Sequence, residues 1–257
     1  MKISVLEQTN EKLRFTLQGV SPAYANTLRR LMIGEVPTLA IEDVVVSRND
    51  SVLYDEIIAH RLGLVVLKTD LDAYTLKYDK DGNRVDGPHS QVAISLRVEG
   101  PKTVYAKDLV SKDKNVVVIY GGTPIVKLTE GQQLEIEAVA TLGIGKVHSK
   151  WNPGLVWYYN EPTIKVNNKS KDFAAFKDKF PPQVFNSKGE IDAKLISNPE
   201  FLDACSGINE DIVNITYDKD AFLFIVESFG ALSAKEIVLR AMEVYDGQLK
   251  AFKAALK

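Results

Sequence analysis

The sequence of 257 residues predicts an α+β protein with two or three domains. Three observations predict this class. Two segments near the start alternate apolar and polar residues as strands do, the middle of the chain continues with short strands and turns, and the chain ends on a long amphipathic helical pattern. A content of 45% hydrophobic and 26% charged residues is ordinary for a globular protein, and it excludes collagen-like and mostly disordered chains.

The first elements are a hairpin and a helix. Ile3 and Val5 alternate with polar residues, and a second alternating run, 13–17, follows a polar turn. Ser21 is a good N-cap, and a proline occupies the first helical position, where its missing N–H does no harm. The helix should end at Gly34, before a proline. Its apolar face comprises Tyr24, Leu28, Leu31 and Met32.

The middle of the chain is β-rich from about Ile41 onward. Residues 92–98 and 134–140 alternate cleanly, with turn-rich stretches between them. Residues 167–209 are polar and contain several prolines, so they predict a small separate unit with a weak helix around 172–180. After it we expect a strand at 213–217, a turn at 218–220 and another strand at 222–227.

The last element is the best-defined helix of the sequence. Ser233 and Glu236 form a capping box at its start. Its apolar face extends for about six turns, or roughly 35 Å. The residues of this face are Ile237, Ala241, Tyr245, Leu249, Phe252 and Leu256. A stripe of this length at a chain end often belongs to a subunit interface. The pattern therefore predicts either such an interface or an ordinary core.

Charge and cysteine content exclude several functions. The formal net charge is −2, so we expect no strong direct nucleic-acid binding. The longest apolar run, 62–67, is far too short to span a membrane. One cysteine, Cys205, excludes an internal disulfide, a Cys-rich zinc site and a cluster held by four thiolates. We therefore expect a cytoplasmic protein without a cofactor.

One group of residues invites a catalytic interpretation. Asp55, Glu56 and His60 could bind a metal, because Glu56 and His60 are four residues apart and share a helix face. A stand-alone metal-dependent enzyme is thus the alternative function. A polar helix face that includes Arg61 is favoured instead, because no companion histidine motif completes a set of three ligands.

Two loops imitate ligand-binding motifs. Gly143-Ile144-Gly145-Lys146 resembles a phosphate loop, but it lacks the spacing and the Ser or Thr that follows the lysine. Residues 79–83 imitate the start of a calcium loop, but Arg84 stands where glycine is required. Both stretches are predicted to be turns.

Two longer segments resemble a known family. Residues 25–38, which begin Ala-Asn-Thr-Leu-Arg-Arg, are similar to the opening helix of the α-like subunits of cellular RNA polymerases. Residues 49–64, Asn-Asp-Ser-Val-Leu-Tyr-Asp-Glu-Ile-Ile-Ala-His-Arg-Leu-Gly-Leu, resemble the signature of the archaeal α-like subunits and of the third-largest subunit of RNA polymerase II. The glycine-lysine-histidine stretch 143–151 fits the same family, and the resemblance covers nearly the whole chain.

The resemblance implies a fold and a non-catalytic function. A discontinuous α/β dimerisation domain would comprise residues 1–42, 148–165 and 216–257, and residues 43–147 would form an inserted β-rich domain. The chain would be the assembly platform of an archaeal RNA polymerase, and the catalytic residues would lie on another subunit. It would bind the small subunit L, the small subunits N and P, and the second-largest catalytic subunit.

The resemblance also implies two interfaces. Subunit L would pair with the two helical faces, through Tyr24, Leu28, Leu31, Met32, Ile237, Ala241, Tyr245, Leu249 and Phe252. The large subunit and the other small subunits would dock on Asp55, Glu56, His60 and Arg61.

Two departures from the family concern metals. Some relatives carry a cysteine-rich loop after the His-Arg-Leu motif, but residues 76–91 contain no cysteine, so we expect no zinc there. Several archaeal relatives insert a ferredoxin-like domain that holds iron–sulfur clusters. Residues 166–215 look like that domain with its ligands lost, since Phe180-Pro181 stands where Cys-Pro would be expected. The sequence therefore predicts a degenerate ferredoxin-like domain without a cluster.

Overall fold

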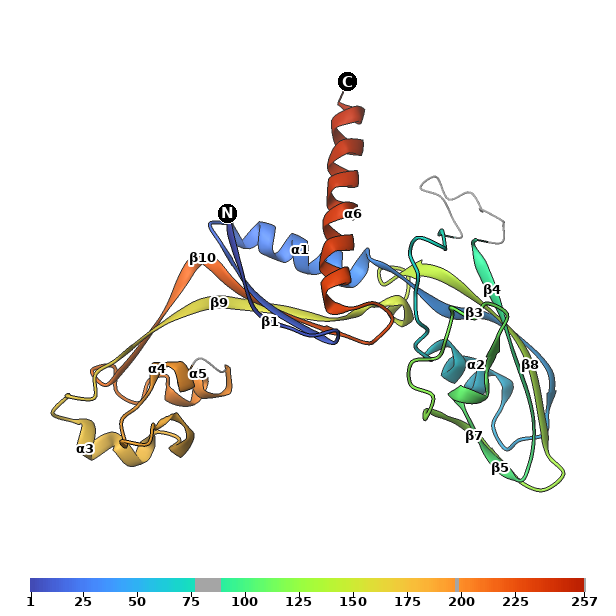
Figure 1. Ribbon diagram of the computed structural model, residues 1–257, viewed down its shortest axis with the longest axis horizontal. Helices are drawn as coiled ribbons and strands as arrows, with labels where there is room; N and C mark the ends of the chain where they lie inside the picture. Colours follow the sequence, from blue (N-terminus) through green and yellow to red (C-terminus); the bar gives the residue numbers. More distant parts are fainter. Residues whose placement is uncertain (77–88, 197–198, 257) are drawn as a thin grey trace. The chain divides into compact units, whose positions relative to one another are not determined.

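The computed structural model describes residues 1–76, 89–196 and 199–256. The calcium-like stretch 79–83 lies outside the described residues. The α+β class is confirmed, with antiparallel sheets and helices from both ends of the chain (Figure 1). The strands are β1 Lys2–Gln8, β2 Lys12–Gln18, β3 Pro37–Asn49, β4 Gln91–Glu99, β5 Lys102–Tyr105, β6 Val110–Ser111, β7 Pro124–Leu128, β8 Gln133–Ile144, β9 Gly154–Val166 and β10 Val213–Ser228.

The helices differ greatly in length. The longer ones are α1 Pro22–Gly34, α2 Asp55–Gly63 and α6 Ala234–Ala255. The short ones are α3 Phe173–Phe176, α4 Ala193–Ile196 and α5 Pro199–Cys205, with 3-10 turns η1 Ala106–Asp108, η2 Ser149–Trp151, η3 Lys177–Lys179 and η4 Pro182–Val184. The predicted hairpin, opening helix and final helix are all present. The weak helix expected around 172–180 is split between α3 and η3.

The chain divides into two compact units. The first comprises Met1–Ser4, Thr16–Pro22 and Tyr158–Leu223, and the second comprises Val5–Phe15, Ala23–Trp157 and Phe224–Lys257. Neither unit is continuous in sequence.

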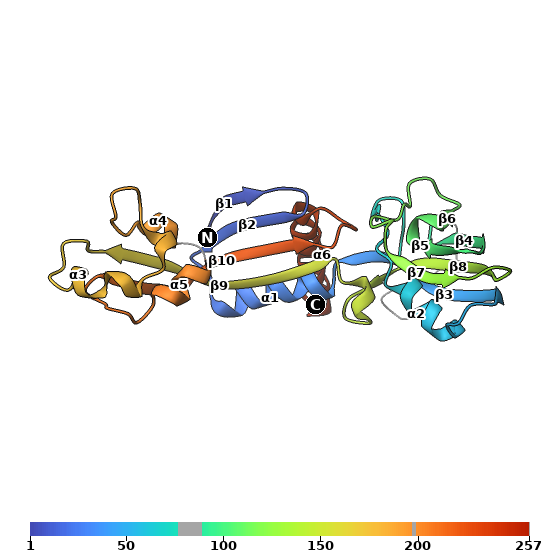
Figure 2. The ribbon, with the colours of Figure 1, turned by 90° about the horizontal axis from the view of Figure 1, so that it is seen from below.

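One four-stranded sheet has the strand order β1-β2-β10-β9 (Figure 2). In the second unit, Phe15 of β2 stacks on Phe224 of β10 with ring centroids 5.1 Å apart. Leu13 and Phe15 are buried, whereas Ile3 and Val5 of the edge strand β1 are more than half exposed. The alternation of the hairpin thus predicts its strands, but only β2 buries its apolar face.

The prediction of a turn at 218–220 is wrong. β10 is continuous from Val213 to Ser228. Partners within the first unit hold its backbone through this stretch, since the carbonyl of Asp218 accepts a hydrogen bond from the Asn160 side chain at 2.7 Å and that of Asp220 accepts from Gly19 N at 2.8 Å. Residues 217–220 are exposed, so the strand tolerates polar side chains that imitate a turn signal.

The β-rich part of the second unit has its own core. β8 is central, with β3 and β4 antiparallel on its two sides, and β6 extends the sheet from β4. β5 and β7 form a separate two-stranded sheet. The alternation predicted for 92–98 and 134–140 is confirmed, because Leu96 pairs with Ile136 and both side chains are buried. α2 adds Ile58 and Leu62 to this core, and neither is accessible to solvent.

The first unit contains a small hydrophobic core of its own. It gathers around η4, α4 and α5 and includes Phe180, Val184, Ile191, Ile196, Leu202, Cys205, Ile212 and Val213. Cys205 is fully buried, and burial raises the pKa of its thiol. The thiol is therefore held in its unreactive protonated form.

Candidate functional site

The sequence-predicted charged group lies along α2. Ile58 and Leu62 fasten the inner face of the helix to the core, so Asp55, Glu56 and His60 project to solvent from the outer face. The acidic residues stand in the first turn and the basic residues in the last, which suits the helix dipole at both ends. The structure thus presents the predicted group on one short, well-anchored helix.

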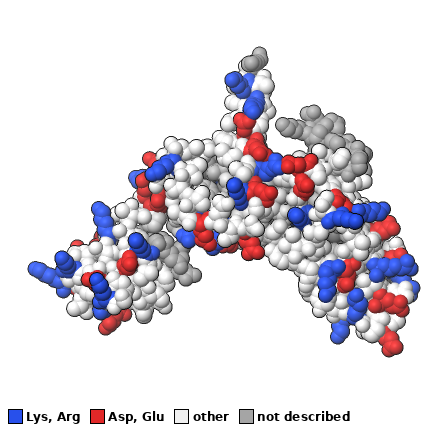
Figure 3. Space-filling model, in the orientation of Figure 1, with Lys and Arg blue, Asp and Glu red and all other residues white. Residues whose placement is uncertain are grey.

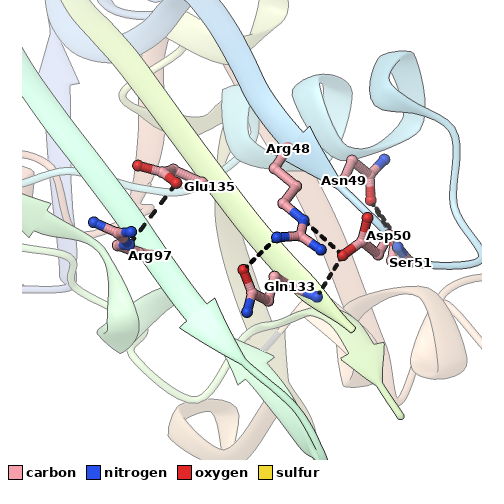
Figure 4. A network of polar contacts seen from close by, with 7 residues as sticks. All are labelled: Arg48, Asn49, Asp50, Ser51, Arg97, Gln133 and Glu135. Carbon is pink, nitrogen blue, oxygen red and sulfur yellow. Dashed lines mark hydrogen bonds and ion pairs between the residues drawn. The ribbon is translucent and has the colours of Figure 1, made fainter. Parts of the chain in front are cut away.

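A polar network fixes the loop that leads into α2 (Figure 4). Arg48 Nε lies 2.8 Å from Asp50 Oδ2, and Arg48 Nη1 donates to the side chain of Gln133 at 2.8 Å. Asn49 accepts a bond from Ser51 Oγ at 2.6 Å and donates its own amide to Asp55 Oδ1 at 2.7 Å. The end of β3, the loop and the first residue of α2 are thereby joined.

Arg61 is held by a contact that the sequence could not reveal. Its Nη1 donates to the carbonyl oxygen of Ile125 in β7 at 2.6 Å. Its guanidinium donates no other hydrogen bond within the described residues, and a guanidinium carries five N–H donors. Arg61 is therefore oriented by the chain and keeps donors for a partner.

Exposed apolar side chains lie next to this charged group. Val52 and Tyr54 are 83% and 80% exposed, and Ile57 and Leu64 are about half exposed. An apolar centre with a charged rim is typical of protein interfaces. We call the residues Val52, Tyr54, Asp55, Glu56, Ile57, His60, Arg61 and Leu64 the α2 surface.

The geometry does not favour a metal centre at Asp55, Glu56 and His60. Asp55 is engaged by Asn49, and the other two side chains stand exposed on the helix. Within the described ranges, no three His, Cys, Asp or Glu side chains gather in an arrangement that could hold a metal ion. Nothing supports the stand-alone metal enzyme.

The two predicted helical faces meet within the second unit, where α1 and α6 lie on the same side of the strands (Figures 1 and 2). Tyr24 of α1 and Tyr245 of α6 make an edge-to-face contact with ring centroids 6.1 Å apart. Five residues of the predicted faces are already buried within the chain: Leu28, Leu31, Met32, Ile237 and Ala241. These five hold the helices in place and present little surface to a partner.

The C-terminal half of α6 remains uncovered. Leu249, Phe252 and Leu256 are 49%, 65% and 72% exposed, and Met242 is 37% exposed. These four side chains lie within about 80° of one another around the helix, given 3.6 residues per turn. They form what we call the α6 stripe.

The start of α6 is firmly anchored. Ser233 Oγ accepts a hydrogen bond from Glu236 N at 3.2 Å, and the Glu236 carboxylate accepts from Ser233 N at 2.8 Å. The predicted capping box is confirmed. The Ser233 hydroxyl also donates to Glu236 Oε2 at 2.6 Å, and this bond, followed by that from Ser233 N, holds the pKa of Glu236 below its usual value. Farther along, Arg240 lies 2.7 Å from Asp72 and 3.0 Å from Glu243.

The glycines of the phosphate-loop imitation serve packing. A Cβ on Gly143 would lie 2.3 Å from the ring of Trp151, and one on Gly145 would lie 2.4 Å from the carbonyl oxygen of Ile33. The backbone N of Lys146 donates to Gly34 O at 3.0 Å, so the loop closes on the end of α1. The alternative of a phosphate loop has no support in this geometry.

A cavity that no sequence pattern predicted lies beside this loop. It has a volume of about 430 Å³ and lies between α1, the loop and α6. Arg29, Arg30, Lys146, Glu35 and Gln248 are among its lining residues. Arg29 and Arg30 lie off the apolar face of the opening helix, which is the only signal that could have indicated them.

None of the helices in the described part of the chain is long and apolar enough to span a membrane.

Comparison with known proteins gives a consistent result. Residues 40–155 match the family described as the RNA polymerase Rpb3/RpoA insert domain. The chain is 39% identical to DNA-directed RNA polymerase subunit Rpo3 of Pyrococcus horikoshii, over 95% of this chain and 93% of that protein. It is 35% identical to the Rpo3 subunit of Methanosarcina acetivorans, over 100% of this chain and 98% of the relative, and 35% identical to that of Methanobrevibacter smithii, over 95% and 93%.

Proposed function

The chain belongs to the family of archaeal DNA-directed RNA polymerase subunit Rpo3, and on this premise we propose how it assembles that polymerase. The family consists of non-catalytic, α-like subunits of a complex whose catalytic site lies on other chains. This chain is accordingly an assembly subunit for transcription and acts in the cytoplasm. It binds other subunits and holds them in their positions in the complex.

The chain pairs with the small α-like subunit L through the α6 stripe. The main support for this pairing is the exposure of the apolar side chains of the stripe. Leaving large apolar side chains in water is unfavourable, because burying each one stabilises by about 1.5–3 kcal/mol. Phe252 and Leu256 are the most exposed members, and no described residue covers them. The edge-to-face pair of Tyr24 and Tyr245 links α1 to the same interface.

The α2 surface recruits the second-largest catalytic subunit, with the small subunits N and P beside it. Val52 and Tyr54 supply apolar area, and Asp55, Glu56, His60 and Arg61 supply charge at its rim. The anchoring of Arg61 to Ile125 supports this role, because an oriented guanidinium can meet a carboxylate with two parallel bonds.

The domain organisation predicted from the sequence places these two interfaces in different domains. The dimerisation domain, 1–42 with 148–165 and 216–257, contains α1 and α6, while the inserted domain, 43–147, contains α2. The match of residues 40–155 to an insert domain and the core formed by residues 39–142 support an inserted domain of about this extent. Residues 166–215 are the third part, a degenerate ferredoxin-like domain whose core is built without cluster ligands.

Co-expression with the small α-like subunit of the same polymerase tests the pairing. We expect one stable heterodimer in size exclusion, and an isolated chain that aggregates or elutes as a mixture. A soluble, monodisperse monomer that ignores the small subunit would refute the proposal.

A further inference from the structure

The positive charge of the first unit is concentrated in one stretch. Residues 165–188 contain six lysines, two aspartates and no other charged residue, so this stretch carries a formal charge of +4 while the rest of the chain carries −6. The modest net charge of the whole chain conceals this asymmetry. We call these six residues the lysine face: Lys165, Lys169, Lys171, Lys177, Lys179 and Lys188.

All six side chains are exposed and lack an acidic partner in the described part of the chain. Some cations of the second unit do have an acidic partner, as with Lys102 and Asp108 at 3.2 Å or Lys250 and Asp246 at 2.5 Å. Figure 3 shows lysine side chains standing out from this unit, at the left of the view. Exposed cations that have no acidic partner among the described residues are available to an anion from outside.

Parts of the lysine face are held in position by the small core. Lys177 lies over the ring of Phe185 at 5.7 Å, and its Nζ lies near Gly189, the neighbour of Lys188. Lys179 lies over the ring of Phe176 at 4.4 Å. These two ammonium groups are therefore partly ordered before any partner binds, which reduces the entropy lost on binding.

We propose that the lysine face binds the phosphate backbone of duplex DNA without sequence preference. Residues 98–239 contain no arginine, so the positive charges of the lysine face are all ammonium groups, which act as point charges. The face lacks the planar guanidinium groups that recognise base edges or carboxylates through two parallel hydrogen bonds. Single strands are bound by stacking bases on open aromatic rings. Of the four phenylalanines in this stretch, Phe176 and Phe185 have lysines over their rings, Phe180 is buried, and Phe173 packs partly buried against the small core. The stretch therefore offers no fully open ring, and backbone contacts to a duplex remain.

Salt dependence of DNA binding is the direct test. The full chain, co-purified with its small α-like partner, is titrated with a short labelled duplex of random sequence between about 50 and 200 mM salt. Each phosphate neutralised contributes about 0.9 to the slope of log K against log salt. We expect the quadruple variant K169Q/K171Q/K177Q/K179Q to lose about 3 to 4 from this slope and most of its affinity.

Two further variants keep the test decisive. K107Q/K112Q/K114Q/K127Q removes the same charge from exposed lysines of the second unit, one of which also lies over a tyrosine ring, and should bind DNA as the unchanged chain does. K169Q/K171Q touches no ring, so it should lose about half as much slope even if the quadruple variant is less stable.

Three results would overturn the proposal. These are no binding at the lowest salt, equal losses in the two quadruple variants, or tighter binding to a polyglutamate peptide than to the duplex. The last would assign the face to an acidic protein surface.

Discussion

The double substitution Leu249→Asp and Phe252→Asp should break the pairing with the small α-like subunit and leave the fold of the chain intact. Leu249 and Phe252 are 49% and 65% exposed, so the chain's own core depends little on them. Burying a large apolar side chain completely stabilises by about 1.5–3 kcal/mol, and scaling this by the two exposed fractions gives about 1.7–3.4 kcal/mol. Since 1.4 kcal/mol is a tenfold change in Kd, the affinity should fall about 15- to 300-fold.

Capture of the chain through a tag on the small subunit, over a concentration series, measures this loss. Leu239→Asp is the matched control, because Leu239 is 50% exposed on the same helix but lies outside the arc of the α6 stripe, about 140° around the helix from Phe252. Its affinity should stay close to that of the unchanged chain, and the helical circular dichroism of both variants should be preserved. Undiminished capture of the double variant, or an equal loss in the control, would refute the assignment of the α6 stripe.

Three other predictions concern separate parts of the molecule. Arg61→Ala, or Glu56→Ala with His60→Ala, should preserve pairing with the small subunit but block recruitment of the large subunit in gel filtration; full assembly with failed transcription would show a different role. Ser233→Ala should lower the free energy of unfolding by about 0.5–2 kcal/mol. Because the pKa of Glu236 is lowered in the folded chain, the stabilisation by the capping box is fully present above the ordinary glutamate pKa, near 4.3, and is lost as the pH falls through the folded value. Acid unfolding curves of the variant and the unchanged chain measure both effects. Iron, sulfide and zinc analysis of anaerobically purified protein should find none of them in stoichiometric amount, and visible cluster absorption would contradict this.

Local patterns predicted the elements whose signals are themselves local. The capping box of Ser233 and Glu236 and the proline at the first position of α1 lie next to the helices that they start. The alternation at 92–98 likewise reflects one buried face of one strand. Each of these patterns depends on residues a few positions apart, so the sequence alone is sufficient.

Features that depend on distant partners could not be predicted. The backbone of β10 at 218–220 is held by Gly19 and Asn160, which a turn signal does not reveal. The contact of Arg61 with Ile125 joins residues 64 positions apart. The apolar period of α6 likewise could not separate Ile237, which is buried in the chain, from Phe252, which is exposed.

Reconstitution of the polymerase from purified subunits, with and without this chain, tests the assembly role most directly. Association of the small α-like subunit and the second-largest catalytic subunit is scored by gel filtration, and activity by transcription from a DNA template. With the chain present, we expect one complex that contains both partners and transcribes. A complete and active polymerase that forms without the chain would contradict its role as the assembly platform.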